Sequence, residues 1–191
     1  MNDVLLTAYA RTLNRVTGCE KIAIPCPVDL RRYKAENQKC GICNLTGNYW
    51  CRVEITPNET FRGTLRKVSE QMYAQKESCG CLKGPMLYHI MFHSLPFPFI
   101  QKIFNRVSPV PITSYTNLGI LDDSKLLFGN HKIADAFIST AVKNAPSFQL
   151  SASTYKGSCT LTSSFYGAKG NKKIIDHFLT EVKNQLESFI S

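Results

Sequence analysis

The chain has 191 residues, of which 43% are hydrophobic, 10% aromatic and 19% charged. These proportions are those of an ordinary globular domain, and they exclude a disordered tail or a fibrous repeat. Every apolar run is shorter than the roughly 18 residues of a membrane-spanning helix, and the start of the chain lacks the basic stretch of a signal peptide. The sequence therefore predicts one compact domain over residues 1–191, located in the cytoplasm.

The basic residues are unevenly distributed along the chain. The formal net charge is +9, and residues 1–110 hold 15 Lys and Arg against 8 Asp and Glu. This excess favours an acidic partner, such as a nucleotide of the coenzyme A type, an acidic carrier protein or nucleic acid. Nucleic acid is disfavoured because the aromatic residues do not alternate with the basic ones, as a base-stacking surface requires.

Helices and strands alternate in the predicted first part of the chain. Residues 3–17 carry an apolar face that extends to Val16, and they predict a helix. Residues 21–28 and 42–55 are predicted to be strands. Residues 56–59 (TPNE) have the pattern of a capping box with proline at the first helical position, so a second helix is expected to start there.

The second part of the chain predicts two short helices, several strands and a closing helix. Pro96 and Pro98 must break the apolar stretch 84–106 into two helical pieces. The segments expected to be extended are 111–119, 126–128, 148–155 and 158–166. The last two flank Lys156 and Gly157, which is typical of a two-residue hairpin turn. The closing helix has an apolar face made of Ile175, Phe178, Leu179, Val182, Leu186, Phe189 and Ile190. Together these elements predict an α/β domain with a mixed β-sheet flanked by helices.

Four of the eight cysteines fall into two close pairs. Cys40 and Cys43 form a C-x2-C pair, and Cys79 and Cys81 form a C-x-C pair. Four thiolates can hold zinc in a tetrahedral site, and a CxxC knuckle is the usual half-site. Two observations argue against zinc. The second pair lacks the standard two-residue spacer, and Cys43 could instead serve as a small apolar packing residue at the start of the predicted strand. Zinc, reduced thiols and core packing therefore stay open as alternatives.

No complete catalytic pattern occurs in the sequence. His89 and His93 are four residues apart and share a helix face, but no glutamate lies between them, so the HExxH zinc pattern fails. Half-buried packing is the favoured interpretation of this pair. The sequence also has no G-x-S-x-G nucleophile elbow and no glycine-rich phosphate loop.

Several blocks of the sequence, taken in order, resemble one superfamily of acyltransferases. Residues 2–9 (NDVLLTAY) resemble the helix that opens the second lobe of condensation-domain-like enzymes. Residues 27–31 (PVDLR) match the end of a strand in the same lobe. Residues 44–49 (NLTGNY) resemble a later strand start, and residues 116–119 (TNLG) with Asp122 resemble a further segment. The superfamily includes nonribosomal peptide condensation domains, alcohol acetyltransferases, wax ester synthases and chloramphenicol acetyltransferase.

The resemblance implies that residues 1–191 form the C-terminal lobe of a two-lobe protein with the chloramphenicol acetyltransferase-like fold of CoA-dependent acyltransferases. In such proteins an acyl thioester, of coenzyme A or a carrier protein, meets a small alcohol or amine in a tunnel between the lobes. The implied activity is transfer of an acyl group, with acetyl as the first expectation. The residues implied as tunnel wall are Asn44, Asn48, Thr116, Asn117 and Gly119. Their alternative role is in the backbone, because Asn and Gly end strands and tolerate left-handed turns.

One departure from the family bears on catalysis. The family's catalytic signature, HHxxxDG, belongs to the first lobe, and this sequence has no adjacent pair of histidines. The chain is therefore expected to lack a general base and to be inactive without an N-terminal lobe as partner. The alternative is a non-catalytic module of the same fold that binds a carrier protein or another partner. The apolar run through Phe92, Leu95, Phe97, Phe99 and Ile100 is expected to be an exposed interface, through which a homodimer could form.

Overall fold

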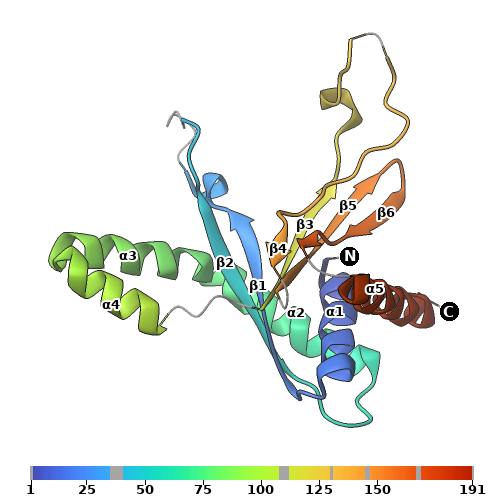
Figure 1. The fold of residues 1–191 in the computed structure, drawn as a ribbon, viewed down its shortest axis with the longest axis horizontal. Coiled ribbons are helices and arrows are strands. Elements are labelled where there is room, and N and C mark those ends of the chain that lie inside the picture. Colours follow the sequence, from blue (N-terminus) through green and yellow to red (C-terminus); the bar gives the residue numbers. More distant parts are fainter. Residues whose placement is uncertain are drawn as a thin grey trace.

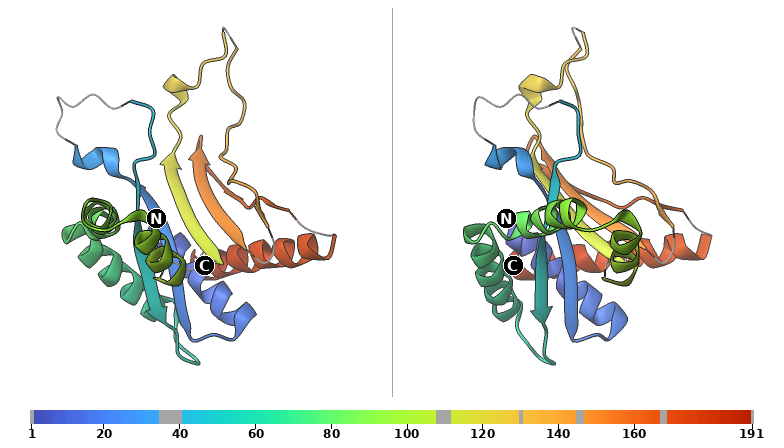
Figure 2. Two further views of the ribbon diagram at one scale, coloured as in Figure 1. Left: turned by 60° about the vertical axis from the view of Figure 1, so that its left-hand side comes forward. Right: turned by 90° about the vertical axis from the view of Figure 1, so that its left-hand side faces the viewer.

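Five strands lie side by side in the computed structural model, and helices pack against them (Figures 1 and 2). The structure describes residues 2–34, 41–107, 112–129, 131–144, 147–166 and 169–190. The five strands are, in spatial order, β2 (Thr46–Glu54), β1 (Lys21–Asp29), β3 (Thr113–Ile120), β5 (Phe148–Tyr155) and β6 (Ser158–Thr162). The helices are α1 (Asn2–Thr17), α2 (Phe61–Glu77), α3 (Lys83–Ser94), α4 (Phe97–Val107) and α5 (Lys169–Ile190). None of the described helices has the length and apolar character needed to cross a bilayer.

The strand pairing is mixed, which confirms the predicted α/β class. Strands β1 and β2 pair antiparallel, β3 and β5 pair parallel, and β5 and β6 pair antiparallel. A separate small parallel pair joins β4 (Lys143–Asn144) to β7 (Phe165–Tyr166). Short 3-10 turns follow β1 at Leu30–Tyr33, precede α3 at Gly80–Leu82, and follow β3 at Asp123–Lys125.

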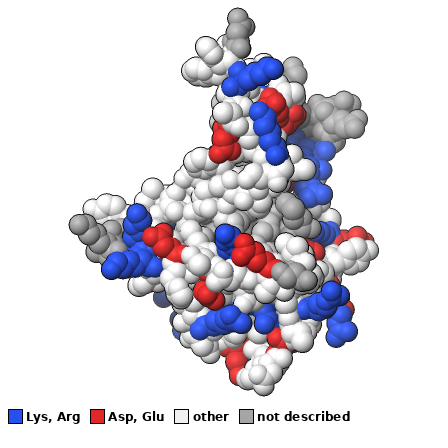
Figure 3. Space-filling model, turned by 90° about the vertical axis from the view of Figure 1, so that its right-hand side faces the viewer, with Lys and Arg blue, Asp and Glu red and all other residues white. Residues whose placement is uncertain are grey.

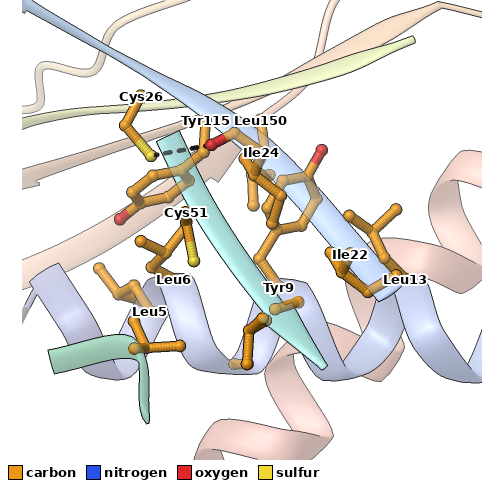
Figure 4. Packing of buried hydrophobic residues seen from close by; sticks show 14 of the residues in the cluster. Leu5, Leu6, Tyr9, Leu13, Ile22, Ile24, Cys26, Cys51, Tyr115 and Leu150 are labelled. Atoms are coloured by element: carbon orange, nitrogen blue, oxygen red, sulfur yellow. Dashed lines mark hydrogen bonds between the residues drawn. The ribbon is translucent and has the colours of Figure 1, made fainter. Parts of the chain in front are cut away.

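The core is built around helix α1, which contacts both α2 and α5 as well as the strands (Figure 4). Tyr9 is fully buried at its centre. The ring of Tyr9 lies 6.0 Å from that of Tyr115, 6.2 Å from Phe148 and 5.5 Å from Phe178, measured between centroids. The Tyr9 hydroxyl is hydrogen-bonded to the side chain of Thr113. One aromatic cluster thus joins α1, β3, β5 and α5.

The predicted hairpin is confirmed at Lys156 and Gly157. Both residues have positive φ, at 46° and 83°, as a type I′ turn requires. The second strand of the hairpin is shorter than expected, because β6 ends at Thr162 and the next two paired residues, Phe165 and Tyr166, belong to the separate pair with β4.

The predicted start of the second helix is wrong by about one turn. Glu59 Oε2 accepts a hydrogen bond of 3.2 Å from the Thr56 N–H, as in a capping box, but Asn58 between them has φ of +65°. The bond therefore closes a turn rather than a helix. The helix begins at Phe61, with Thr60 as its N-cap.

Other boundaries also differ from the sequence prediction. Strand β2 occupies Thr46–Glu54 rather than 42–55, and residues 126–128 form only an isolated bridge between Phe128 and His131. Val16 is 49% exposed and Ile190 is 80% exposed, although both were predicted on buried helix faces. Both lie in the last turns of their helices, where no described element packs over them.

Side chains of α2 cover the outer edge of strand β2. The pairs are Gln75 with Trp50, Gln71 with Arg52, and Lys67 with Glu54. Their hydrogen bonds to the strand backbone measure 2.6–2.9 Å. The match follows from geometry, since helix residues four apart rise about 6 Å and strand residues two apart rise about 6.6 Å. The helix side chains thus take the place of a neighbouring strand along this edge.

The same pattern fixes the direction of the backbone in strand β1. Because Trp50 bonds outward to Gln75, its partner Pro25 must direct its own backbone away from β2. Pro27, two residues on, faces the same way. Strand β3 lies on that side (Figure 2), yet no backbone ladder joins β1 to β3 in the described residues. Since proline has no N–H to donate, Pro25 and Pro27 account for this open seam between β1 and β3.

Candidate functional site

A small pocket opens where the seam ends, and we call it the seam pocket. Its volume is about 190 Å³. Cys26 and Pro27 from β1 and Tyr115 and Asn117 from β3 form its two sides, and Asn2 at the start of α1 also lines it. The pocket therefore brings together residues from three blocks that carry the family resemblance. These blocks lie at the start of α1, at the end of β1 and in β3.

Tyr115 places an unpartnered hydroxyl at this pocket. Its side chain is 1% exposed, and its hydroxyl has no hydrogen-bond partner of regular geometry within the described part of the chain, although the Asn117 side chain lies close enough to act on its pKa. Burial raises the pKa of Tyr115, so the phenol stays protonated and can donate. A buried polar group without a partner costs stability, and such groups are rare in folded proteins. A ligand in the pocket would supply the missing partner.

Asn117 organises the backbone around the pocket. Its Nδ2 donates to Asn2 Oδ1 at 3.1 Å, and its Oδ1 accepts from the Gly119 N–H at 2.8 Å. Gly119 has φ of +72°, and the pairing of β3 with β5 shifts register between Asn117 and Ile120. Asn117 thus joins β3 to the start of α1 at a β-bulge, a feature often found beside functional sites.

Two cations, Arg32 and Lys76, also line the seam pocket. Both side chains are exposed, and neither forms an ion pair with any acid that the structure describes. The Arg32 guanidinium lies 5.6 Å from the centre of the Tyr33 ring. The hydroxyl of Tyr33 in turn bonds that of Tyr49, at 2.6 Å, on the pocket wall. Unpaired cations beside a polar pocket favour an anionic ligand.

The thiol of Cys26 in this pocket is not activated. Burial raises the pKa of Cys26 to about 12, with the nearby Cys51 adding to the effect. Its Sγ contacts the Ile24 carbonyl at 3.7 Å (Figure 4). A thiol of this kind stays protonated at neutral pH and is a poor nucleophile. The chemistry of the pocket is therefore that of binding and hydrogen bonding.

A second, larger pocket lies along the outer edge of β2, and the α2 glutamines Gln71 and Gln75 are among its lining residues. We call it the edge pocket. Its volume is about 770 Å³, and Asn44, Asn48, Trp50 and Tyr88 are among its lining residues. The Trp50 ring stacks with the Arg52 guanidinium, 5.2 Å from its centre. The edge pocket thus combines polar amides with aromatic surface.

The five residues predicted to form a tunnel wall do not meet in one pocket. Asn44 and Asn48 line the edge pocket, whereas Asn117 lines the seam pocket. Thr116 and Gly119 flank Asn117 in β3 but line neither pocket. Their role as tunnel wall stays a prediction.

Arg32, Lys76 and Tyr115 were not singled out from the sequence. Arg32 directly follows the PVDLR block and Tyr115 directly precedes TNLG, so extending each block by one residue would have found these two. Lys76 lies on the distant helix α2 and left no signal in the sequence.

The cysteine pairs are placed differently from one another. Cys81 is buried, Cys79 is partly buried and Cys43 is exposed, while Cys40 lies outside the described residues. Within the described ranges, no three His, Cys, Asp or Glu side chains lie close enough together to hold a metal ion. The zinc hypothesis therefore depends on Cys40 and stays a prediction.

All four histidines are exposed, and none lines the seam pocket or the edge pocket. His93 Nδ1 lies 2.8 Å from the His89 carbonyl, and the two rings are 4.2 Å apart. The interpretation of His89 and His93 as half-buried packing residues is wrong, because both side chains are exposed.

Comparisons with known proteins identify the fold. No family model matches the chain, and no curated protein matches it in sequence. Solved structures do match. The polyketide synthase associated protein 5 from Mycobacterium tuberculosis aligns over 97% of this chain, with a TM-score of 0.61 and 16% identity. The starter condensation domain of rhizomide synthetase RzmA aligns over 96% of this chain, with a TM-score of 0.57 and 13% identity. The PapA2 acyl transferase aligns over 98% of this chain, with a TM-score of 0.59 and 11% identity.

The fold is that of the CoA-dependent acyltransferases. Identities this low show the fold and nothing more. The alignments cover 45%, 41% and 38% of the three matched chains, so this chain spans less than half the length of each. That coverage is consistent with one lobe of a two-lobe protein.

The unpartnered hydroxyl of Tyr115 leads to a prediction about stability. We expect Tyr115→Phe to leave the free energy of unfolding unchanged or to raise it by up to about 1 kcal/mol, because no hydrogen bond of regular geometry is lost. The matched control is Tyr49→Phe, which loses its bond to Tyr33 and should lower that free energy by about 1 kcal/mol. Urea unfolding of the three proteins measures both. A greater loss for Tyr115→Phe than for Tyr49→Phe would contradict the assignment.

Proposed function

We propose that this chain is the C-terminal lobe of an acyltransferase. Its substrates would be a thioester of coenzyme A or of a carrier protein and a small alcohol or amine, with acetyl transfer to an alcohol as the simplest case. The observation that carries the proposal is the fold, which is shared with condensation domains and an acyl transferase along nearly the whole chain. The basic character of the chain supports an anionic donor.

The reaction requires a base that the described pockets do not contain. The acceptor oxygen or nitrogen attacks the thioester carbonyl carbon, the C–S bond breaks, and the acceptor proton passes to a base while the thiolate leaves. None of the four histidines lines either pocket. The base would come from an N-terminal lobe, as the family resemblance implies, and this chain would bind and orient the donor.

The seam pocket is the better candidate for the donor. Arg32 and Lys76 offer charge to the phosphates of coenzyme A or a carrier arm, whereas Tyr115 and Asn117 offer hydrogen-bonding groups deeper in the pocket. A space of about 190 Å³ admits the thioester end of such a molecule rather than its nucleotide. The nucleotide would then remain at the surface, near the two cations.

Neutralising the two cations tests the donor site. We expect the double variant Arg32→Gln, Lys76→Gln to raise the Kd for coenzyme A roughly tenfold, because each exposed ion pair contributes up to about 1 kcal/mol. Isothermal titration calorimetry at low and high salt measures the effect, which should shrink as salt screens the charges.

The matched control is Arg66→Gln, Lys125→Gln, which removes the same charge from side chains that are 78% and 82% exposed and line neither pocket. The control should bind coenzyme A like the unchanged protein. An equal loss in both double variants would mean that only the net charge matters, and the seam pocket would not be the donor site.

The absence of a histidine from both pockets also fits the alternative function, a non-catalytic module that binds a carrier protein. Turnover separates the two functions. Release of free thiol from acetyl-coenzyme A is measured with the protein at its full natural length, with and without an alcohol or amine. Thiol release that depends on the acceptor supports the acyltransferase, whereas carrier binding without thiol release supports the module.

A further inference from the structure

Helices α3 and α4 form an arm that projects from the outer edge of β2, which α3 contacts (Figures 1 and 2). We call Lys83–Ser94 together with Phe97–Val107 the arm. Six of its large apolar side chains are more than half exposed, namely Met86, Leu87, Ile90, Phe92, Phe97 and Phe99. Exposed apolar patches of this kind mark interaction surfaces in folded proteins.

Other apolar residues of the arm are buried or pack between its two helices. The prediction that Ile100 is exposed is wrong, because its side chain is only 3% exposed. The rings of Tyr88 and Phe104 lie 5.6 Å apart and join α3 to α4. Helix α4 separates apolar from polar residues strongly, with Lys102 and Arg106 in its polar set. An amphipathic helix with aromatic and basic side chains is typical of segments that lie in a membrane interface.

The charge of the arm is of one sign. No acidic residue occurs between Glu77 and Asp122 in the sequence. Lys83, Lys102 and Arg106 are exposed, and none of them pairs with an acid in the described ranges. The face that includes α5 differs, because there Lys and Arg are interspersed with Asp and Glu (Figure 3). The arm thus joins apolar surface to uncompensated positive charge.

We propose that the arm binds peripherally to the surface of an anionic membrane. Its aromatic and aliphatic side chains would enter the boundary between headgroups and acyl chains, while its cations contact the lipid headgroups. A second copy of this chain fits less well, because two such arms would bring only positive charges together. Anionic headgroups supply the opposite charge that the arm itself lacks. The association requires no spanning helix and is independent of acyl transfer.

Vesicle co-sedimentation of the protein at its full natural length tests the proposal. We expect binding to phosphatidylcholine vesicles with about 30% phosphatidylserine and none to phosphatidylcholine alone. Added salt should weaken the binding. The variant Lys83→Gln, Lys102→Gln, Arg106→Gln should bind about a hundredfold more weakly, since each basic residue near such a surface contributes about one factor of five.

The apolar side of the arm is tested with Phe97→Ser, Phe99→Ser, which should weaken vesicle binding at least about tenfold. The matched control is Phe128→Ser, Phe137→Ser, in which the two phenylalanines are 73% and 59% exposed against 64% and 63% for the arm pair. The control should bind like the unchanged protein, and thermal melting should show that all variants remain folded.

Three results would overturn the proposal. The first is equal binding to neutral and anionic vesicles, or none to either. The second is an equal effect of the arm variants and of the control pair. The third is a protein that gel filtration shows to be dimeric, that becomes monomeric through Phe97→Ser, Phe99→Ser, and whose vesicle binding is unchanged. In that case the arm is an interface between copies of this chain.

Discussion

The missing backbone ladder between β1 and β3 is the constraint on which the candidate site depends. Pro25 and Pro27 direct their backbones toward β3 and have no N–H to donate, so the sheet stays open along this line. The opening leaves Tyr115 buried with a free hydroxyl and places Asn117 beside the first residues of α1. An uninterrupted ladder would pair the backbone along this line and leave little room for a pocket. A local loss of sheet hydrogen bonding thus creates the space in which a ligand can replace the missing partners.

The elements around the seam are held by contacts that do not involve the pocket. The aromatic cluster around Tyr9 joins α1 to β3, β5 and α5, and the glutamines of α2 complete the outer edge of β2. The seam is therefore bordered by two firmly packed halves. Such an arrangement suits the proposed role, in which this chain orients a donor and an N-terminal lobe supplies the base.

Much of the fold could be predicted from local patterns, whereas the candidate site could only partly be predicted. Lys156 and Gly157 specify a hairpin by themselves, and the proline at 96 ends α3, because turns and breaks are local. The start of α2 was misplaced because Thr56 and Glu59 form the same hydrogen bond in a turn as in a capping box. The seam pocket includes Lys76 from the distant helix α2, and no local pattern in the sequence indicates that it lies there. The open seam itself depends on which way the two prolines face, and that follows only from the pairing register of β1 with β2.

Hydrogen–deuterium exchange tests the central claim, that the seam between β1 and β3 binds the thioester donor, most directly. Exchange of this chain is compared with and without an unreactive thioether analogue of acetyl-coenzyme A. The account predicts slower exchange at the amides of Tyr115 and Asn117 in β3, which line the seam pocket. The amides of Cys26 and Val28 in β1 face β2 and should exchange at an unchanged rate, because the β1 residues that face the seam are prolines. Protection confined to Asn44 and Asn48 in the edge pocket, or no protection at saturating analogue, would contradict it.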